Sequence, residues 1–310
     1  EEERGHLSNT IELWDAVPKY SVSRYRQAKM RKGGALKILK QSFRFRGTEY
    51  RMVLQPAKIE TEQGEMEFYP SEREELIEDA LRKMACQKGL GFMDRDGSGV
   101  FFTMAGLRRL LSEYGHTMSY PRIVESLQIM NRCTLQISLH GERNAFYSAS
   151  IFPEIGAVSR DDWEKDPSAK WFVRFSPLVS KSIMDVTYRQ LDLKRMMSHP
   201  MQLARWLHKR MAHLYIQASM LHPYGIRLST ILRDSGLLSY KEVRYAAREV
   251  EKALKILKEG EVITSYEAKK EYVKRSLVDV HYALYPHPIF VRQAKASNKR
   301  MRVHACAVKE

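Results

Sequence analysis

What this sequence lacks excludes several classes of protein. Its three cysteines, Cys86, Cys133 and Cys306, are far apart and form no C-x-x-C pair, so neither a disulfide framework nor a zinc site is expected. No run of 18 apolar residues and no signal-peptide pattern occurs, which predicts a cytoplasmic protein. No glycine-rich phosphate-binding loop ending in Lys-Ser or Lys-Thr occurs either, so nothing supports an ATP-driven mechanism.

Two patterns imitate metal or catalytic chemistry without completing it. Residues 94–99 resemble the opening of a calcium-binding EF-hand loop, but Ala105 stands where that loop needs a bidentate glutamate, so we interpret them as a glycine-rich turn. His281 and His287 do not form the H-x-H pattern of nicking enzymes, and sixteen tyrosines cannot by themselves identify a nucleophile. We therefore expect a protein that is not an enzyme, with no catalytic residue, no metal and no cofactor.

Positive charge is concentrated in two parts of the chain. The net charge is −4 over residues 1–15, +10 over 16–48, −4 over 49–185 and +13 over 186–310, within a total of +15. A surplus that served only solubility would be spread evenly, so we expect nucleic acid as the partner. An anionic membrane is disfavoured because the apolar face of the basic helix described next carries core residues and is not free to insert.

Residues 240–257 have the period of a helix with one apolar and one basic face. At about 100° per residue, one arc holds apolar side chains and the opposite arc holds mainly basic ones. The apolar arc comprises Val243, Ala246, Ala247, Val250, Leu254 and Leu257, and the opposite arc comprises Lys241, Arg244, Tyr245, Arg248, Lys252 and Lys255. Ser239 and Glu242 form an S-x-x-E pattern, which predicts a capping box at the start of the helix.

The segments on either side complete a DNA-binding pattern. Residues 228–234 predict a shorter helix, and Gly236 lies in a connection of helix-turn-helix length. Residues 261–267 and 276–285 predict a hairpin with a basic tip, the wing of a winged helix. The alternative is an ordinary solvated face on a packed helix, which the neighbouring turn and hairpin disfavour.

The first half of the chain predicts a similar order of elements. Strands are expected within 43–60 and near 66–69, followed by a helix that begins at a capping box of Ser71 and Glu74. Helices over 104–114 and 119–131, a hairpin of 133–140 with 144–152, a polar loop over 153–170 and a closing strand at 171–175 follow. Gly115 between the two helices corresponds to Gly236 in the second half.

These patterns predict an α+β fold of two tandem winged-helix domains with an extended basic N-terminal arm. The arm is residues 1–40, expected to be flexible. The first winged-helix domain is 41–184, for support or dimerisation. The second is 185–310, the main DNA reader, and begins with a long helix over 200–220.

The second domain is expected to contact bases because its recognition helix is the more basic. In the first domain, the corresponding helix has only Arg122 and Arg132, with Glu125 between them. An arginine on such a helix can contact guanine with two hydrogen bonds, and Arg244 and Arg248 are the candidates. The full set of DNA-contact candidates is Ser239, Tyr240, Lys241, Arg244, Tyr245, Arg248, Lys252, Lys269, Lys270, Lys274, Arg275, Arg122, Arg24 and Arg26.

The paired helix-turn-helix units, Phe102-Thr103 before a helix and the Gly115 turn resemble the plasmid replication initiators of the tandem winged-helix type, the TrfA-like and RepA-like iteron-binding family. Residues 10–18 (Thr-Ile-Glu-Leu-Trp-Asp-Ala-Val-Pro) resemble the Gln-Leu-x-Leu-Phe element by which such initiators bind the host sliding clamp, with Thr10 and Trp14 in the Gln and Phe positions. Ile11, Leu13 and Trp14 would be the apolar anchors in the partner. The alternative is that Leu13 and Trp14 pack on the first domain of the protein itself.

What the resemblance implies is a function: binding of direct repeats in double-stranded origin DNA, opening of an A+T-rich region, recruitment of host initiator, helicase and clamp, and plasmid copy control. Single-stranded DNA and a second copy of the chain are further candidate partners. A plasmid or phage transcriptional repressor built from the same two winged helices is the main alternative. A nicking or recombining enzyme is a third.

Overall fold

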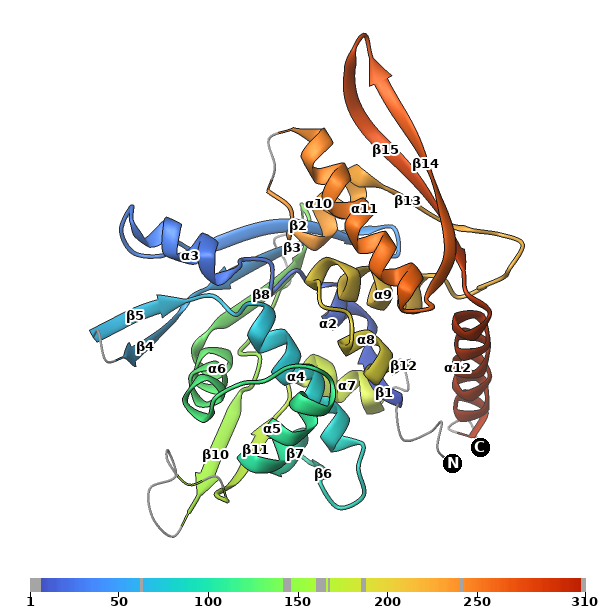
Figure 1. Ribbon diagram of the computed structural model, residues 1–310. Coiled ribbons are helices and arrows are strands. Elements are labelled where there is room, and N and C mark those ends of the chain that lie inside the picture. Colours follow the sequence, from blue (N-terminus) through green and yellow to red (C-terminus); the bar gives the residue numbers. More distant parts are fainter. Residues whose placement is uncertain are drawn as a thin grey trace. The chain divides into compact units, whose positions relative to one another are not determined.

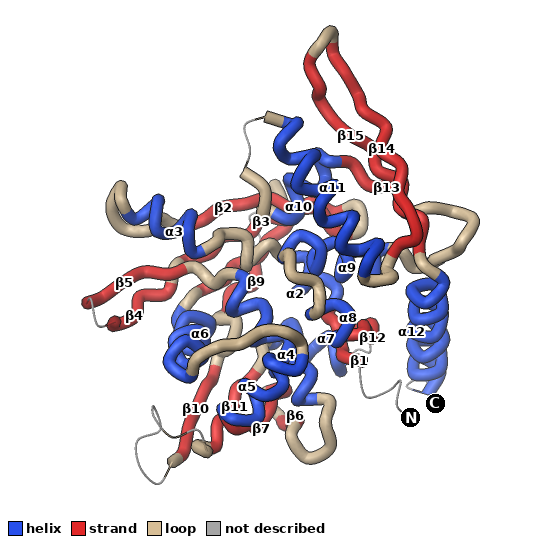
Figure 2. The backbone as a smooth tube through the Cα atoms, in the orientation of Figure 1, coloured by secondary structure: helices blue, strands red, loops and turns tan. Residues whose placement is uncertain are grey.

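The computed structural model describes residues 7–61, 64–141, 146–159, 166, 168–184, 188–239 and 242–307. The chain divides into two compact units (Figures 1 and 2). The C-terminal unit comprises 1–17, 43–47 and 186–310, and the central unit comprises 18–42 and 48–185. Within the described ranges, no helix is long and apolar enough to span a membrane.

The C-terminal unit combines helices with one three-stranded sheet. Its elements are β1 (Leu7–Ile11), α2 (Glu12–Ala16), β12 (Tyr188–Asp192), α8 (Leu193–Met197), α9 (Gln202–Leu214), β13 (Tyr224–Arg227), α10 (Leu228–Ser235), α11 (Val243–Glu259), β14 (Ile263–Val273), β15 (Ser276–Pro286) and α12 (Pro288–Ala307). The three-stranded sheet has the order β13-β15-β14, and β1 pairs antiparallel with β12. Apolar side chains of α9, α10, α11 and the sheet form one core, which includes Leu207, Ile231, Leu254 and Tyr282.

The central unit contains most of the strands. Its elements are α3 (Arg24–Arg31), β2 (Leu39–Phe45), β3 (Thr48–Gln55), β4 (Ala57–Thr61), β5 (Gly64–Phe68), α4 (Glu72–Ala85), β6 (Gly91–Asp94), β7 (Gly97–Thr103), α5 (Met104–Glu113), α6 (Tyr120–Arg132), β8 (Thr134–Leu139), β9 (Phe146–Ala149), β10 (Glu154–Val158), β11 (Lys170–Arg174) and α7 (Pro177–Met184). Its sheets have the orders β10-β11-β7-β6, β2-β3-β8-β9 and β4-β5. Residues 43–47, which comprise the end of β2 and the turn to β3, are grouped with the C-terminal unit.

The two units share an order of elements. In the central unit α4, β7, α5 and α6 are followed by β10 and β11, and in the C-terminal unit α9, β13, α10 and α11 are followed by β14 and β15. The last strand of each set pairs with both others, giving β10-β11-β7 and β14-β15-β13. The internal repeat predicted from the sequence is therefore present in the arrangement of strands as well as in their order.

The hairpin predicted at 133–152 forms, but it does not occupy the wing position of the repeat. β8 pairs with β9 and also with β3, far upstream, so this hairpin extends a different sheet. The strand pair that corresponds to β14 and β15 is β10 and β11. Residues 154–158, predicted as part of a polar loop, are therefore a strand, because β11 supplies the backbone partners that local sequence does not reveal.

The predicted extended arm is folded where the structure describes it. Residues 12–16 and 24–31 are helices, and residues 7–11 form a strand. Trp14 is fully buried and Val17 and Val22 are nearly so, which explains the order: these apolar side chains lose water contact only if the segment packs. The basic charge of 16–48 suggested an extended arm, but the basic residues alternate with apolar residues that are buried.

One of the two predicted capping boxes is present. At the start of α4, Glu74 accepts hydrogen bonds from the backbone N–H and the hydroxyl of Ser71, both at 2.7 Å. At the start of α11, the N-cap is Glu242, not Ser239, and it makes no side-chain capping bond. The helix therefore begins at Val243, three residues later than predicted.

Candidate nucleic-acid interface

Helix α11 presents the basic face predicted from the sequence. Ala246, Ala247, Val250, Leu254 and Leu257 are buried in the core, whereas Arg244, Arg248 and Lys255 are exposed. Tyr245 is half exposed, with the Arg248 guanidinium 6.0 Å from its ring centroid. Lys252 is exposed and bonds to Glu249 at 2.7 Å, one turn earlier. The face therefore offers arginine donors together with an aromatic ring, the groups that contact base edges and phosphates.

Short helix α10 and its exit hold α11 in place. Gly236 ends α10 in the left-handed conformation at φ +62°, which a side chain would disfavour. Just before it, Asp234 is buried and accepts hydrogen bonds from Arg233 at 2.6 and 3.0 Å and from the backbone N–H of Arg44 at 2.9 Å. Arg210 of α9 pairs with the same carboxylate at 2.9 Å. One buried acid thus joins three segments of the C-terminal unit at the turn before α11.

A second aspartate fixes α10 against the sheet. Asp279 of β15 accepts hydrogen bonds from the backbone N–H of Ser229, at 3.0 Å, and from its hydroxyl, at 2.7 Å. Ser229 lies in the first turn of α10, so a strand residue satisfies a helix N-terminus. Partial burial by itself raises the pKa of Asp279, but these hydrogen bonds outweigh it and hold the pKa below its usual value.

The β14–β15 hairpin is long and basic, and it projects beyond the other elements of its unit (Figure 1). Lys274 and Arg275 form its two-residue turn, with Lys274 at φ +55°, and Lys269 and Lys270 lie on β14. All four are exposed. Two acids lie near this turn: Glu271 is paired with Asp279 across the strands, and both contact Arg227, at 3.0 and 3.7 Å. The predicted basic tip is therefore present, although two of its lysines belong to a strand.

Helix α6 occupies the corresponding place in the central unit but has a different exposed face. Ile123, Val124, Leu127 and Met130 are buried as predicted, and Arg122 and Arg132 are exposed. Glu125 pairs with Arg73 and lies 3.4 Å from Arg24. Part of the charge on this face is thus neutralised within the protein.

Arg24, a candidate DNA contact from the sequence, is engaged within the protein. Its guanidinium donates to Glu74 at 2.7 Å and lies over the ring of Phe68, 4.7 Å from the centroid. Burial alone raises the pKa of Glu74, but Arg24 and Arg73 outweigh that effect and lower it. Arg26 is half-buried on α3. Arg24 is therefore part of the internal packing of the central unit, and Arg26 is only partly accessible.

The predicted clamp-binding peptide also packs within the protein. Trp14 is fully buried on α2, a helix that contacts α9 of the C-terminal unit, and Leu13 is half-buried. The alternative of self-packing is thus the arrangement seen, although the surface covered belongs to the C-terminal unit. Ile11 is the last residue of β1, and its side chain is not among those that the structure describes.

The structure brings together in one unit most of the residues expected to contact DNA. Arg244, Tyr245, Arg248 and Lys252 share α11, and Ser239, in the preceding turn, is exposed. Tyr240 and Lys241 lie outside the described residues. Sequence reasoning missed Asp234 and Asp279, whose roles depend on partners 24 to 190 residues away. An isolated aspartate carries no local signal of such a role.

No protein-family model matches this sequence, and no curated protein does. Solved structures match its fold: "Crystal structure of SeMet derivatives of domain2 and domain 3 of RctB" has a TM-score of 0.54 at 14% identity, covering 89% of this chain and 98% of that one. "Crystal structure of the RctB domains 2-3" has a TM-score of 0.52 at 11% identity, covering 92% and 99%. "Crystal structure of Pi initiator protein in complex with iteron DNA" has a TM-score of 0.47 at 12% identity, covering 70% and 91%. The fold of this chain is thus similar to that of domains 2 and 3 of RctB.

Proposed function

We propose that this protein is a replication initiator that binds repeated sites in double-stranded DNA through its C-terminal unit. The observation that carries the proposal is the pairing, in one unit, of an exposed basic helix with an adjacent basic hairpin. Both units would be winged helices, with α11 placed in the major groove and the β14–β15 hairpin against the neighbouring backbone. The resemblance in fold to RctB domains 2 and 3 supports the assignment.

The first test is binding to double-stranded sites across a salt series. The C-terminal unit exposes eight candidate phosphate or base contacts on α11 and the hairpin: Arg244, Arg248, Lys252, Lys255, Lys269, Lys270, Lys274 and Arg275. If six to eight of them engage DNA, log K falls with log salt with a slope of about −5 to −7. Steep and specific binding to direct repeats supports the proposal, whereas weak binding to every sequence contradicts it.

Opening of the origin distinguishes an initiator from a repressor with the same DNA-binding units. With no phosphate-binding loop in the sequence, we propose that binding and bending energy drives the opening, at a deformation cost of roughly 1 to 6 kcal/mol. Permanganate reactivity of thymines in an adjacent A+T-rich segment reports this directly. Reactivity that rises with the purified protein supports initiation, and tight binding without it supports a repressor.

We also propose that the protein acts without catalysis and recruits the host clamp, helicase and initiator. Strand cleavage with covalent attachment to a tyrosine would contradict the first part. For the clamp, burial of Trp14 means that α2 must leave its site before the peptide can bind. A Leu13→Ala, Trp14→Ala double variant that binds the clamp as well as the original chain in a pull-down would contradict the assignment of residues 10–18 as the clamp-binding peptide.

A further inference from the structure

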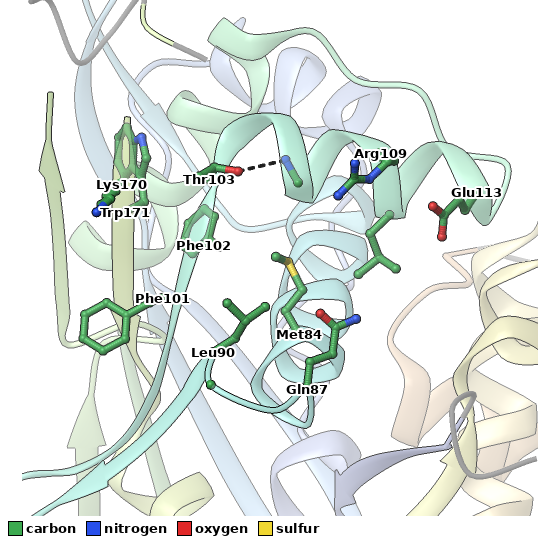
Figure 3. Close-up of a pocket in the computed structure, with 13 residues that line it drawn as sticks. Met84, Gln87, Leu90, Phe101, Phe102, Thr103, Arg109, Glu113, Lys170 and Trp171 are labelled. Carbon is green, nitrogen blue, oxygen red and sulfur yellow. Dashed lines mark hydrogen bonds between the residues drawn. The ribbon is translucent and has the colours of Figure 1, made fainter. Parts of the chain in front are cut away.

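The central unit contains a groove of about 660 Å³ that has no part in the DNA interface described above (Figure 3). It lies between the end of α4, strand β7, helix α5 and strand β11. Such a volume accommodates several side chains or a small ligand. The groove is therefore large enough to hold side chains of a bound peptide.

The floor of this α4–α5 groove is apolar and its rim is polar. Met84, Phe102, Leu110 and Trp171 line it and are buried, at 8% exposure or less. Gly106 also lines it, on the first turns of α5, where a side chain would narrow the space. The rim comprises Gln87, Phe101, Arg109, Glu113 and Lys170. A buried apolar floor inside a charged rim is the pattern of a protein–protein anchor site.

Phe101, which also lines the groove, belongs to an aromatic surface on the face of the sheet opposite to Phe102 and Trp171. Phe101 is 51% exposed, and its ring centroid lies 4.8 Å from that of Phe92 and 6.1 Å from that of Phe172. Glycines keep these rings flat on the sheet: a Cβ at Gly99 would lie 2.3 Å from the ring of Phe92, and one at Gly156 would lie 2.3 Å from the ring of Phe172. Apolar area beyond the groove itself favours an extended occupant over a small molecule.

The charges at the rim favour an acidic occupant. Arg109 and Lys170 are exposed, and neither makes an ion pair with any residue in the described part of the chain. Lys88, in the turn between Gln87 and Gly89, is also exposed. Glu113 is the acid at the groove, so the cations outnumber it. Nucleic acid is disfavoured because the floor is apolar and has no basic group on it for a phosphate.

We propose that the α4–α5 groove binds an acidic peptide segment of another protein, with an aromatic or leucine side chain on the apolar floor and flanking carboxylates at Arg109 and Lys170. An apolar anchor combined with charged contacts at the rim is a general way in which short linear segments are recognised. The surface lies on the central unit and does not depend on the proposed contact between α11 and DNA.

The test is selection from a phage-displayed library of random peptides on the full-length chain, followed by binding measurements with the enriched synthetic peptides. We expect enrichment of acidic peptides with an aromatic or leucine residue. Phe101→Ala and the double variant Arg109→Glu, Lys170→Glu should each weaken binding at least about tenfold. Phe146→Ala is the matched control for the first, since Phe146 is 67% exposed elsewhere on the unit, and Lys181→Glu is the control for the charge changes.

Three results would overturn the proposal. They are no enriched peptide, enrichment of basic peptides, and binding that Phe101→Ala leaves unchanged. A change in oligomeric state with Phe101→Ala, measured by light scattering, would instead make the surface an interface between copies of this chain and would also overturn it. DNA binding by these variants should stay unchanged, so failure here and failure of the proposed DNA function are separate outcomes.

Discussion

Helices α6 and α11 occupy the same place in two repeats of one arrangement, yet their exposed faces differ in how charge is used. On α6, Glu125 lies between Arg73 and Arg24, so opposite charges meet within the protein. On α11, Arg244, Arg248 and Lys255 extend into solvent. Because ion pairs at a surface stabilise a fold only weakly, unpaired cations cost little there and remain available to phosphate. The two repeats therefore share an arrangement of helices and strands, but they differ in surface charge and so in what their corresponding helices can bind.

The largest expected effect is loss of specific DNA binding on α11. With Arg244 and Arg248 both changed to Ala, affinity for the specific site should fall at least about 30-fold, since each bidentate contact contributes about 1–3 kcal/mol. The matched double variant on α6, Arg122→Ala with Arg132→Ala, should lose less than about fivefold. Fluorescence anisotropy at one salt concentration measures both. Equal losses in the two variants would remove the distinction between the helices.

The next largest effect is a dependence of stability on pH, which arises from two buried histidines of the C-terminal unit. His199 and His208 are buried, 3.0 Å apart between Nε2 and Nδ1, and burial together with neighbouring cations lowers the pKa of His199 to about 4 and that of His208 as well. The unfolded chain takes up these protons first as the pH falls, so stability is complete above pH 6.5 and is lost as the pH falls toward 4. His199 alone should contribute a loss of up to about 3 kcal/mol.

Urea unfolding between pH 7 and 4 measures this loss. In His199→Gln the free energy of unfolding should depend less on pH, whereas His222→Gln, at an exposed position, should keep the original profile. A profile that is unchanged in His199→Gln would show that the buried pair does not set the acid sensitivity.

A third change breaks the internal pairing of the central unit. In Glu74→Gln the charges of Arg24 and Arg73 lose their buried partner, and we expect about 2 kcal/mol less stability, an amount moderated by the partial exposure of both arginines. Denaturant unfolding reports it, with exposed Glu113→Gln as the control. DNA affinity should stay within about twofold, since this network serves packing and not recognition.

The smallest effect concerns the link between α10 and the sheet. Asp279→Ala removes the acceptor for the N–H and hydroxyl of Ser229, and the loss of a helix cap should cost about 1 kcal/mol of unfolding free energy. Glu271→Ala, which removes a more exposed partner of Arg227, should cost less than about 0.5 kcal/mol. Equal costs would mean that the cap does not contribute beyond a surface ion pair.

The sequence predicted the elements whose signals are local. The stripe of α11, helix α10 and the β14–β15 hairpin all follow from spacing within about 60 residues, and they are present with shifts of a few residues. The basic side of the candidate interface could be predicted for the same reason. Helix α12 was not predicted, because over residues 288–299, the part of it whose burial is described, the buried large apolar side chains are Phe290 and Val291.

The predictions failed for elements whose position depends on a partner far away in the sequence. Residues 7–11 looked like part of an extended arm because their partner strand is at 188–192, and the 133–152 hairpin looked like a wing because its partner β3 lies about 80 residues earlier. Hydrophobic alternation predicts a strand but not the strand beside it. Likewise, the cationic stretch at 16–48 does not show that Arg24 is committed to Glu74, since Glu74 lies 50 residues later.

The pairing of β1 with β12 also has a consequence for how the chain is made. Residues 7–11 leave the ribosome before their partner strand, which is synthesised about 180 residues later, roughly 10 to 35 s at ordinary translation rates. During that interval the whole central unit emerges and can fold, while the first strand and the Trp14 helix wait without their packing surface. Completion of the C-terminal unit therefore requires segments that the central unit separates in sequence to pair with one another, a step that favours slow assembly and leaves Trp14 without its packing surface until α9 has been made.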